Sequence, residues 1–234
     1  MPSPGAASAR PSAPPSSEPS GARVQTLVPT PVGEARITRY PAEGTPKALL
    51  ALGHGAGGGI EARDLQALAA ALPARGITVA LVEQPWRVAG KKLGPAPKTL
   101  DQGWLPVLAE LAGSGLPLVA GGRSAGARVA CRTAEAVGAV AVVALAFPLH
   151  PPGKPERSRA EELLGSGRPT LVVQGGKDTF GTPEEFPQLP TGHELVAIPY
   201  AGHGFSVPKR APLGQDEALR QITDAVGDWI LALR

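Results

Sequence analysis

Short apolar runs alternate along the chain with longer segments whose apolar residues recur at helical spacing. The segments 65–72, 100–111 and 219–233 repeat apolar residues at intervals of three and four, which places them on one face of a helix. Strands that alternate with helices form right-handed crossovers, so the pattern predicts an α/β fold with a doubly wound, mostly parallel sheet flanked by helices. The apolar runs predict core strands at 48–52, 77–82, 116–120, 140–147, 170–174 and 195–199.

The first 22 residues differ in composition from the rest of the chain. They are rich in Pro, Ala and Ser and hold little apolar surface to bury, so we predict a disordered tail over residues 1–22 and one α/β domain over residues 23–234. They also lack the charged start and apolar centre of a signal peptide. The domain is expected to open with an antiparallel pair of strands at 24–27 and 33–40.

Charge and composition argue against several classes of function. The chain carries 23 Lys and Arg residues and 20 Asp and Glu residues, a formal net charge of +3, without a long basic run, so we expect no nucleic-acid partner. The longest apolar stretch, 137–149, contains Gly and Pro and is shorter than the roughly 20 residues of a membrane span. A single cysteine, Cys131, forms no disulfide within the chain, which favours a cytoplasmic protein. No metal-ligand spacing is visible, and we expect neither metal nor cofactor; the oligomeric state stays open.

One apolar run ends in a pattern that is typical of a nucleophile elbow. The sequence Gly122-Arg123-Ser124-Ala125-Gly126 follows it, and a helix-forming segment comes next. A serine on so sharp a turn needs small residues two positions before and after it, because a Cβ there would collide with the neighbouring strand or helix. The turn lifts the serine hydroxyl above the sheet edge, beside the N-terminal N–H groups of the helix. The segment therefore predicts a nucleophile for acyl transfer at Ser124.

Two later apolar runs end in an acid and a histidine. The first leads to Asp178, and the second leads to His203 between two glycines. Because functional groups in such sheets collect in the loops beyond the carboxyl ends of the strands, we expect both residues to meet Ser124. His203 is then the general base, and Asp178 orients its ring and stabilises the imidazolium. The alternatives are a turn or N-cap role for Asp178 and a solvated loop for His203.

These stretches, together with His54-Gly55-Ala56-Gly57, resemble the α/β-hydrolase superfamily and, within it, the small bacterial dienelactone-hydrolase-like proteins. The likeness runs from about residue 24 to the C-terminus, and the chain order Ser, Asp, His is that of the superfamily. The resemblance implies an α/β-hydrolase fold with a short lid. Dienelactone hydrolases proper use a cysteine nucleophile, whereas this chain has serine at the elbow.

The glycine-rich loop after the first core strand is a candidate oxyanion hole. Hydrolases of this fold take one oxyanion N–H from this loop and another from the residue after the nucleophile. The candidate donors are the amides of Ala56 and Ala125, with Gly57 as a substitute for Ala56, since one residue of loop register decides which N–H faces the substrate. A phosphate-binding loop is the alternative: no P-loop Lys-Ser/Thr follows, although Glu83 ends the next strand.

Several cations are candidates for binding the substrate. Residues 84–98 are predicted to form a long loop at the carboxyl edge of the sheet. We expect Trp86 and Arg87 in this loop, with the lysines that follow, to contact an anionic substrate. A solvated loop is the alternative. Arg123 at the elbow either contacts the same substrate or pairs with an acid.

The segment 148–165 occupies the place of a lid. It holds prolines and charges but few large apolar residues, which favours small or medium acyl groups over the long chains that lipases bind. His150 within it either lines the pocket or faces water. His54 is expected to hydrogen-bond to the backbone, and Cys131 to fill the core.

The ordered constellation predicts a serine hydrolase that cleaves a small or medium ester, lactone or thioester through an acyl-enzyme on Ser124. A peptidase or an acyltransferase uses the same triad and differs in pocket shape and in the nucleophile that reaches the acyl-enzyme. A third alternative is a non-catalytic binding module on the same fold. The partner expected in every case is a small molecule, whose identity the sequence leaves open.

Overall fold

The computed structural model describes residues 23–233, and the tail expected over residues 1–22 lies outside them. Eight strands form one sheet in the order β1-β2-β4-β3-β5-β6-β7-β8. The strands are β1 (Val24–Thr30), β2 (Gly33–Tyr40), β3 (Ala48–Gly53), β4 (Ile77–Glu83), β5 (Leu118–Arg123), β6 (Ala141–Leu145), β7 (Thr170–Gly175) and β8 (His193–Ile198). The helices are α1 (Arg63–Ala71), α2 (Pro85–Val88), α3 (Pro97–Ala112), α4 (Ala125–Thr133), α5 (Ala160–Leu164) and α6 (Gln215–Ala232), with 3-10 turns η1 (Pro73–Arg75) and η2 (Pro183–Glu185).

The sheet is parallel from β4 through β8, and the antiparallel pair β1 and β2 extends it at one edge. From β3 the chain first adds β4 on one side and then returns to add β5 on the other. A crevice forms outside the carboxyl ends of strands where the strand order reverses in this way. The loop after β3 and the turn after β5 flank this crevice, so the topology brings the glycine-rich loop and Ser124 together.

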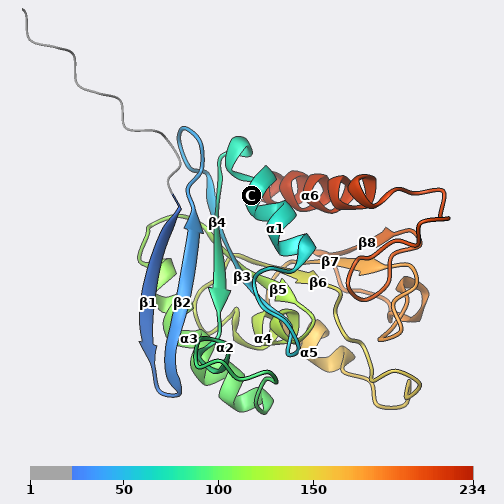
Figure 1. Cartoon of the computed structure of the whole chain (residues 1–234), viewed down its shortest axis with the longest axis horizontal. Coiled ribbons are helices and arrows are strands. Elements are labelled where there is room, and N and C mark those ends of the chain that lie inside the picture. The colour runs from blue at the N-terminus through green and yellow to red at the C-terminus, as the bar shows by residue number, and fades with distance from the viewer. Residues whose placement is uncertain (1–22, 234) are drawn as a thin grey trace, which may run out of the picture.

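Two apolar layers sandwich the sheet. One core packs α3 and α4 against one face, and the other packs α1 and α6 against the opposite face (Figure 1). Along β3 the side chains alternate between them: Leu49 and Ala51 belong to the first core, and Leu50 and Leu52 to the second. Burial on both faces explains why the core strands read as continuous apolar runs rather than as an alternating pattern. The expected α/β fold is confirmed.

The structure corrects some of the expected boundaries. Residues 84–98 are not a continuous loop, because Pro85 begins the short helix α2 and Trp86 is buried in the core beneath it. The strand expected over 140–147 ends at Leu145, since Ala146 turns into a backbone conformation with φ of 45°.

Three backbone segments meet closely where β3, β5 and α4 cross. A Cβ on Gly126 would lie 2.6 Å from the carbonyl oxygen of Gly53, and one on Gly122 would lie 2.6 Å from the carbonyl carbon of Gly126. Both neighbours are backbone atoms, which a change of rotamer does not move. The crossing therefore requires glycine at both positions, as the elbow pattern predicts.

We expect Gly126→Ala to lower the free energy of unfolding by about 3 kcal/mol, because the added methyl group forces α4 away from β3. Urea unfolding of the purified protein measures the change. Gly58→Ala is a matched control, since a Cβ there meets nothing within 4 Å, and its effect should stay within about 0.5 kcal/mol. Equal unfolding free energies for the two variants would show that the crossing is not tight.

Candidate active site

Ser124 sits in a strained turn between β5 and α4. Its φ of 55° and ψ of −114° lie in a region that residues other than glycine rarely adopt. The turn is held because the Ser124 N–H donates to the carbonyl of Leu145 at the end of β6, at 2.9 Å. This conformation turns the side chain away from the sheet and places its hydroxyl at the floor of a cavity. Strain of this kind clusters at functional sites.

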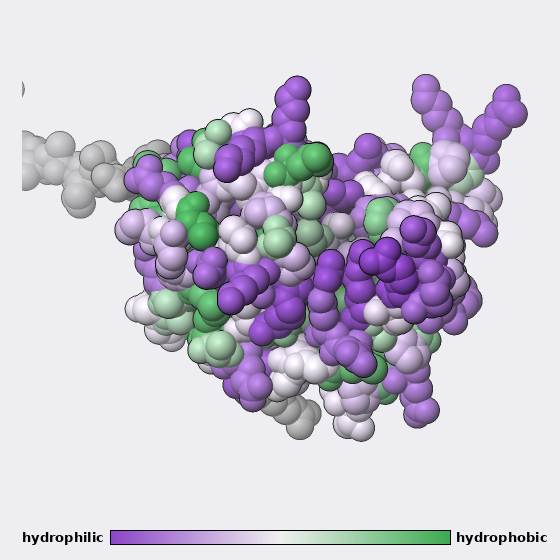
Figure 2. Space-filling view, turned by 90° about the horizontal axis from the view of Figure 1, so that it is seen from below, coloured by the Kyte–Doolittle hydropathy of each residue, from purple (hydrophilic) through white to green (hydrophobic). Residues whose placement is uncertain are grey.

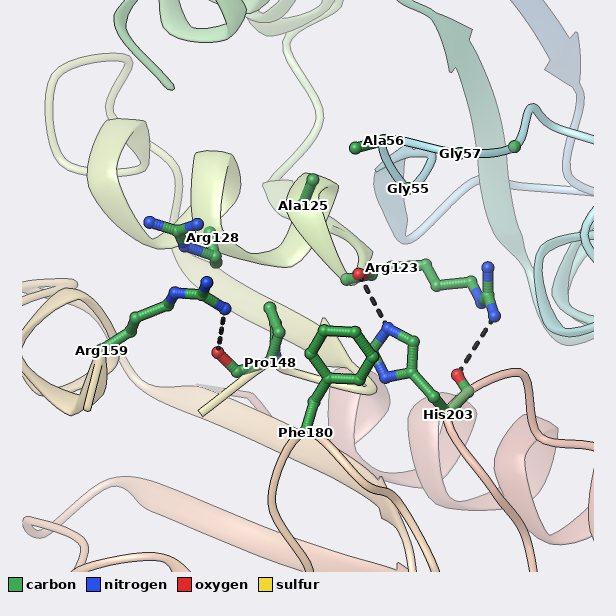
Figure 3. A pocket seen from close by; sticks show the side chains of 12 residues that line it. Gly55, Ala56, Gly57, Arg123, Ala125, Arg128, Pro148, Arg159, Phe180 and His203 are labelled. Atoms are coloured by element: carbon green, nitrogen blue, oxygen red, sulfur yellow. Dashed lines mark hydrogen bonds between the residues drawn. The ribbon is translucent and has the colours of Figure 1, made fainter. Parts of the chain in front are cut away.

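The three residues expected to form a triad are brought together from three separate loops. Ser124 Oγ lies 2.9 Å from Nε2 of His203 (Figure 3). Nδ1 of His203 lies 2.9 Å from Oδ2 of Asp178. Asp178 follows β7, and His203 follows β8. When Nδ1–H donates to the carboxylate, Nε2 holds a lone pair that faces the hydroxyl of Ser124. The arrangement is that of a nucleophile, a base and an acid that orients the base.

Asp178 is buried, and its carboxylate is fully occupied by hydrogen bonds. Besides His203, it accepts from the N–H of Phe180 at 2.8 Å and from Nε2 of Gln174 at 3.0 Å. Gln174 Nε2 also donates to the carbonyl of Gly181, at 2.8 Å, and so ties the acid to the loop that carries it. The ring of Phe180 stacks on the His203 imidazole with 4.1 Å between centroids. These contacts fix the acid and the plane of the base.

Arg123 ties the histidine loop to α1. Its Nη2 donates to the carbonyl of His203 at 3.1 Å, and its Nε lies 3.3 Å from Oδ1 of the fully buried Asp64. Burial raises the pKa of the Asp64 carboxyl, and the adjacent guanidinium opposes that rise. Of the two roles that the sequence left open for Arg123, pairing with an acid is the one observed, although the side chain also reaches the cavity wall.

The cavity above Ser124 has a volume of about 420 Å³ and is bounded by the glycine-rich loop, the start of α4, Pro148 and Phe180. The amides of Ala56, Gly57 and Ala125 border it. Among the residues that the structure describes, none of these three N–H groups has a protein acceptor. They are therefore available to an oxygen atom in the cavity.

His54 shapes this loop through both ring nitrogens. Nδ1–H donates to the carbonyl of Gly55 at 2.9 Å, and Nε2 accepts the N–H of Gln84 at 3.1 Å. Burial lowers the pKa of the ring, which favours the neutral tautomer that these two bonds require. The expected loop-shaping role of His54 is what the structure shows. The expected core position of Cys131 is also observed, and burial raises the pKa of its thiol to about 12.

Three of the residues expected to contact substrate do not line the cavity. Trp86 is buried with its ring edge-on to His54, because its large apolar surface packs into the core. Arg87 points to the surface and pairs with Glu61 at 3.2 Å. His150 is buried in the segment over the site, where Nε2 contacts Glu185 at 2.6 Å. The pairing with Glu185 raises the pKa of His150, and neither role expected for it, lining the cavity or facing water, is observed.

Two arginines that the sequence analysis did not single out do line the cavity. They are Arg128, on the first turns of α4, and Arg159, just before α5. Arg128 follows Ser124 by four residues, so helical periodicity could have placed it one turn beyond the nucleophile. No local pattern marks Arg159, Gln174 or Phe180, whose positions depend on how distant loops pack.

A second Ser–His contact lies elsewhere and lacks these features. Ser166 Oγ is 3.4 Å from Nε2 of His193, but Ser166 is buried and also bonds to Thr170. Among the described residues no carboxylate contacts the His193 ring. This pair therefore offers a control for experiments on Ser124.

Residues 23–233 show neither a metal cluster nor a membrane-spanning helix. No three His, Cys, Asp or Glu side chains in that range gather as metal ligands would. None of its helices combines the length and the apolar character that crossing a bilayer requires.

We expect Arg123→Met to destabilise the protein in a pH-dependent way. Without the guanidinium, the pKa of Asp64 rises further above its unfolded value of about 4, so the folded state binds a proton that the unfolded state releases. The free energy of unfolding of the variant therefore falls as the pH rises from the unfolded pKa through the folded one. We expect the variant to be less stable than the wild type by about 3 kcal/mol at pH 8, and by less toward pH 4. Urea unfolding at several pH values measures this.

The double variant Asp64→Asn/Arg123→Met is the control for this prediction. It removes the Asp64 carboxyl together with the guanidinium, so it should lack the loss of stability with rising pH that the single variant shows. A deficit of the single variant that is constant from pH 5 to pH 8 would contradict the assignment of the Arg123–Asp64 pair.

Comparison with known proteins places the chain in a family. Residues 46–231 match the profile of the alpha/beta hydrolase domain family. No curated protein sequence matches the chain significantly. Solved structures with similar folds include an alpha-beta serine hydrolase homologue from Coxiella burnetii, at 19% identity and a TM-score of 0.66 over 87% of this chain and 97% of that one.

Two further structures share the fold. An a/b serine hydrolase without a lid from Xanthomonas campestris has 21% identity and a TM-score of 0.64, over 93% of this chain and 97% of that one. A dienelactone hydrolase from Anabaena variabilis has 20% identity and a TM-score of 0.70, over 92% and 99%. The expected likeness to these proteins is borne out at the level of fold. Because the family profile spans most of the described residues, the chain belongs to the alpha/beta hydrolase family and is a hydrolase.

Proposed function

We propose that this hydrolase cleaves esters, lactones or thioesters of small or medium acyl groups through a covalent acyl-enzyme on Ser124. His203 is the general base, and Asp178 orients it. The amides of Ala56 and Ala125 form the oxyanion hole, with Gly57 as the alternative donor from the same loop. The observation that carries the proposal is the continuous chain of contacts from Ser124 Oγ through His203 to the buried carboxylate, at 2.9 Å for each step, inside an open cavity.

The proposed reaction has two halves. In the first, His203 Nε2 takes the Ser124 proton as Oγ bonds to the acyl carbon, and the amides stabilise the oxyanion by about 3 kcal/mol each. The acyl–heteroatom bond then breaks, and the imidazolium returns the proton to the leaving group. In the second half His203 deprotonates water, which attacks the acyl carbon and releases the acid, so that Ser124 recovers its proton.

The surroundings of the cavity support a small substrate. A volume of about 420 Å³ lies toward the lower end of the range for small-molecule sites, and the segment over it carries the short helix α5 rather than a long apolar lid. The face toward which the β4 arrow points in Figure 1 is covered mainly by hydrophilic side chains, with apolar residues in small groups (Figure 2). Such a face is unlike the broad apolar surface with which a lipase meets lipid.

Peptidases and acyltransferases use the same triad. A peptidase differs in the shape of its pocket, and an acyltransferase differs in the nucleophile that attacks the acyl-enzyme.

We place the protein in the cytoplasm in this proposal, because its single cysteine is buried and forms no disulfide within the chain. The absence of a nucleic-acid partner stays a prediction from the charge pattern.

We expect a fluorophosphonate probe to label the wild-type protein, because the hydrogen bond from Ser124 to the His203 base activates the hydroxyl as a nucleophile. Ser124→Ala should abolish labelling, and His203→Ala should lower it strongly. On a panel of short-chain esters Ser124→Ala should reduce kcat by at least about 1,000-fold.

Ser166→Ala is the matched control, since it removes a serine hydroxyl that also contacts a histidine but lies outside the cavity. It should keep both labelling and esterase activity. Labelling that persists in Ser124→Ala, or a folded wild type that neither labels nor cleaves any ester, would overturn the proposed function and favour a binding module.

A further inference from the structure

We infer that the substrate of this site carries a carboxylate, which Arg159 binds in the cavity with Arg128 beside it. The inference rests on the proposed function, since it names the class of ester that Ser124 attacks. It assigns recognition of an anion to Arg128 and Arg159 in place of Trp86 and Arg87, which lie outside the cavity.

Three guanidinium groups reach the cavity wall, and two of them are already paired. Arg123 is held by Asp64 and by the His203 carbonyl. Arg128 forms a bidentate pair with Glu162, from Nε to Oε2 at 2.7 Å and from Nη2 to Oε1 at 2.6 Å. Arg159 has no ion pair with any residue that the structure describes; its Nη1 donates to the carbonyl of Pro148 at 3.1 Å. Arg159 is therefore the cation that an incoming anion meets.

The local charge balance is positive. Glu162 is shared between Arg128 and Arg132, and Arg132 also pairs with Asp101. Together with Arg159 this gives three guanidinium groups for two carboxylates, so one positive charge is not neutralised. Partial burial and the neighbouring Arg128 both lower the pKa of Arg159, in that order of importance. A monoanion bound here would restore neutrality in the cluster.

The guanidinium groups are also placed to hold such an anion. Figure 3 shows Arg128 and Arg159 close together on one side of the His203 ring, with Arg123 on the other side. The Pro148 carbonyl holds the Arg159 side chain against the cavity wall. The backbone N–H of Arg159 donates to the carbonyl of Leu149 at 2.7 Å. The remaining N–H groups of Arg159 and Nη1 of Arg128 have no described protein acceptor.

A carboxylate suits this arrangement better than a larger or more highly charged anion. The guanidinium fork matches the two oxygens of a carboxylate, and a single charge equals the single excess cation. With the anion at Arg159, the cavity of about 420 Å³ leaves room for a short chain between it and the ester carbon at Ser124. Monoesters of short dicarboxylic acids, or esters of short hydroxy acids, have this shape.

Direct binding tests the inference without depending on catalysis. Calorimetric titration of Ser124→Ala protein with pentanoate should show binding that pentanamide, its neutral analogue, lacks. Arg159→Met in the same background should weaken pentanoate binding by about 10- to 100-fold, the range for a lost charge-assisted contact. Arg157→Met is the matched control, because Arg157 is an exposed cation two residues away and should leave binding unchanged. Inorganic phosphate is titrated in parallel.

Kinetics supply the second readout. The wild type should prefer ethyl hydrogen glutarate to ethyl pentanoate, or acetoxyacetate to propyl acetate, by at least about 10-fold in kcat/KM. Arg159→Met should remove most of this ratio, and Arg159→Lys, which keeps the charge but not the fork, should retain part of it. Raising the salt concentration should lower the wild-type ratio.

The outcomes separate the two proposals. The carboxylate inference alone is overturned if Ser124 is labelled and neutral esters are cleaved, but the protein shows no preference in kcat/KM for the carboxylate esters. A preference that Arg159→Met leaves unchanged overturns it too. Phosphate that binds through Arg159 in place of pentanoate overturns it as well. Pentanoate binding that depends on Arg159 in a protein that is neither labelled nor active supports the carboxylate site and overturns the hydrolase reaction.

Discussion

The close approach of three backbone segments is the constraint on which the rest of the site depends. β3, β5 and α4 cross so tightly that Gly122 and Gly126 leave no room for a side chain. Ser124, between them, is forced into a φ of 55°, at a cost of about 1–3 kcal/mol that packing of α4 against the sheet offsets. The same turn brings the hydroxyl to the cavity, and the Ala125 amide, which has no acceptor among the described residues, borders the same space. One steric restriction therefore places both the proposed nucleophile and a proposed oxyanion donor at the cavity.

The other two members of the candidate triad have no such backbone constraint, and side chains hold them instead. Asp178 is fixed by the buried amide of Gln174, and the His203 loop is fixed by Arg123, which Asp64 anchors from α1. None of these three supporting residues touches the serine hydroxyl. The 2.9 Å contacts of the candidate triad thus depend on loops that buried hydrogen bonds hold in place. Removing one partner of such a bond costs more free energy than the bond contributes when it forms.

The parts of the molecule that sequence could predict are those that local rules determine. Burial on both faces gives continuous apolar runs, so the core strands could be located, and the elbow glycines revealed Ser124 because sterics alone demand them. The prediction that Trp86 contacts the substrate is wrong. Its position after the carboxyl end of a strand indicates a loop, but its large apolar side chain is buried in the core. Arg159 and Gln174 could not be found, since their roles arise from contacts between loops distant in the chain.

Three features that cost folding free energy lie around one cavity. A serine with positive φ, a buried carboxylate on Asp64 and an uncompensated guanidinium on Arg159 each cost folding free energy, and all three lie within or behind the wall that surrounds Ser124. Elsewhere in the part of the chain that the structure describes, Arg36, Arg75 and Arg220 each pair with a carboxylate. A protein that tolerates such costs at one place is best understood if a ligand recovers them. The unpaired cation at Arg159 is the cost that an anionic substrate would offset directly.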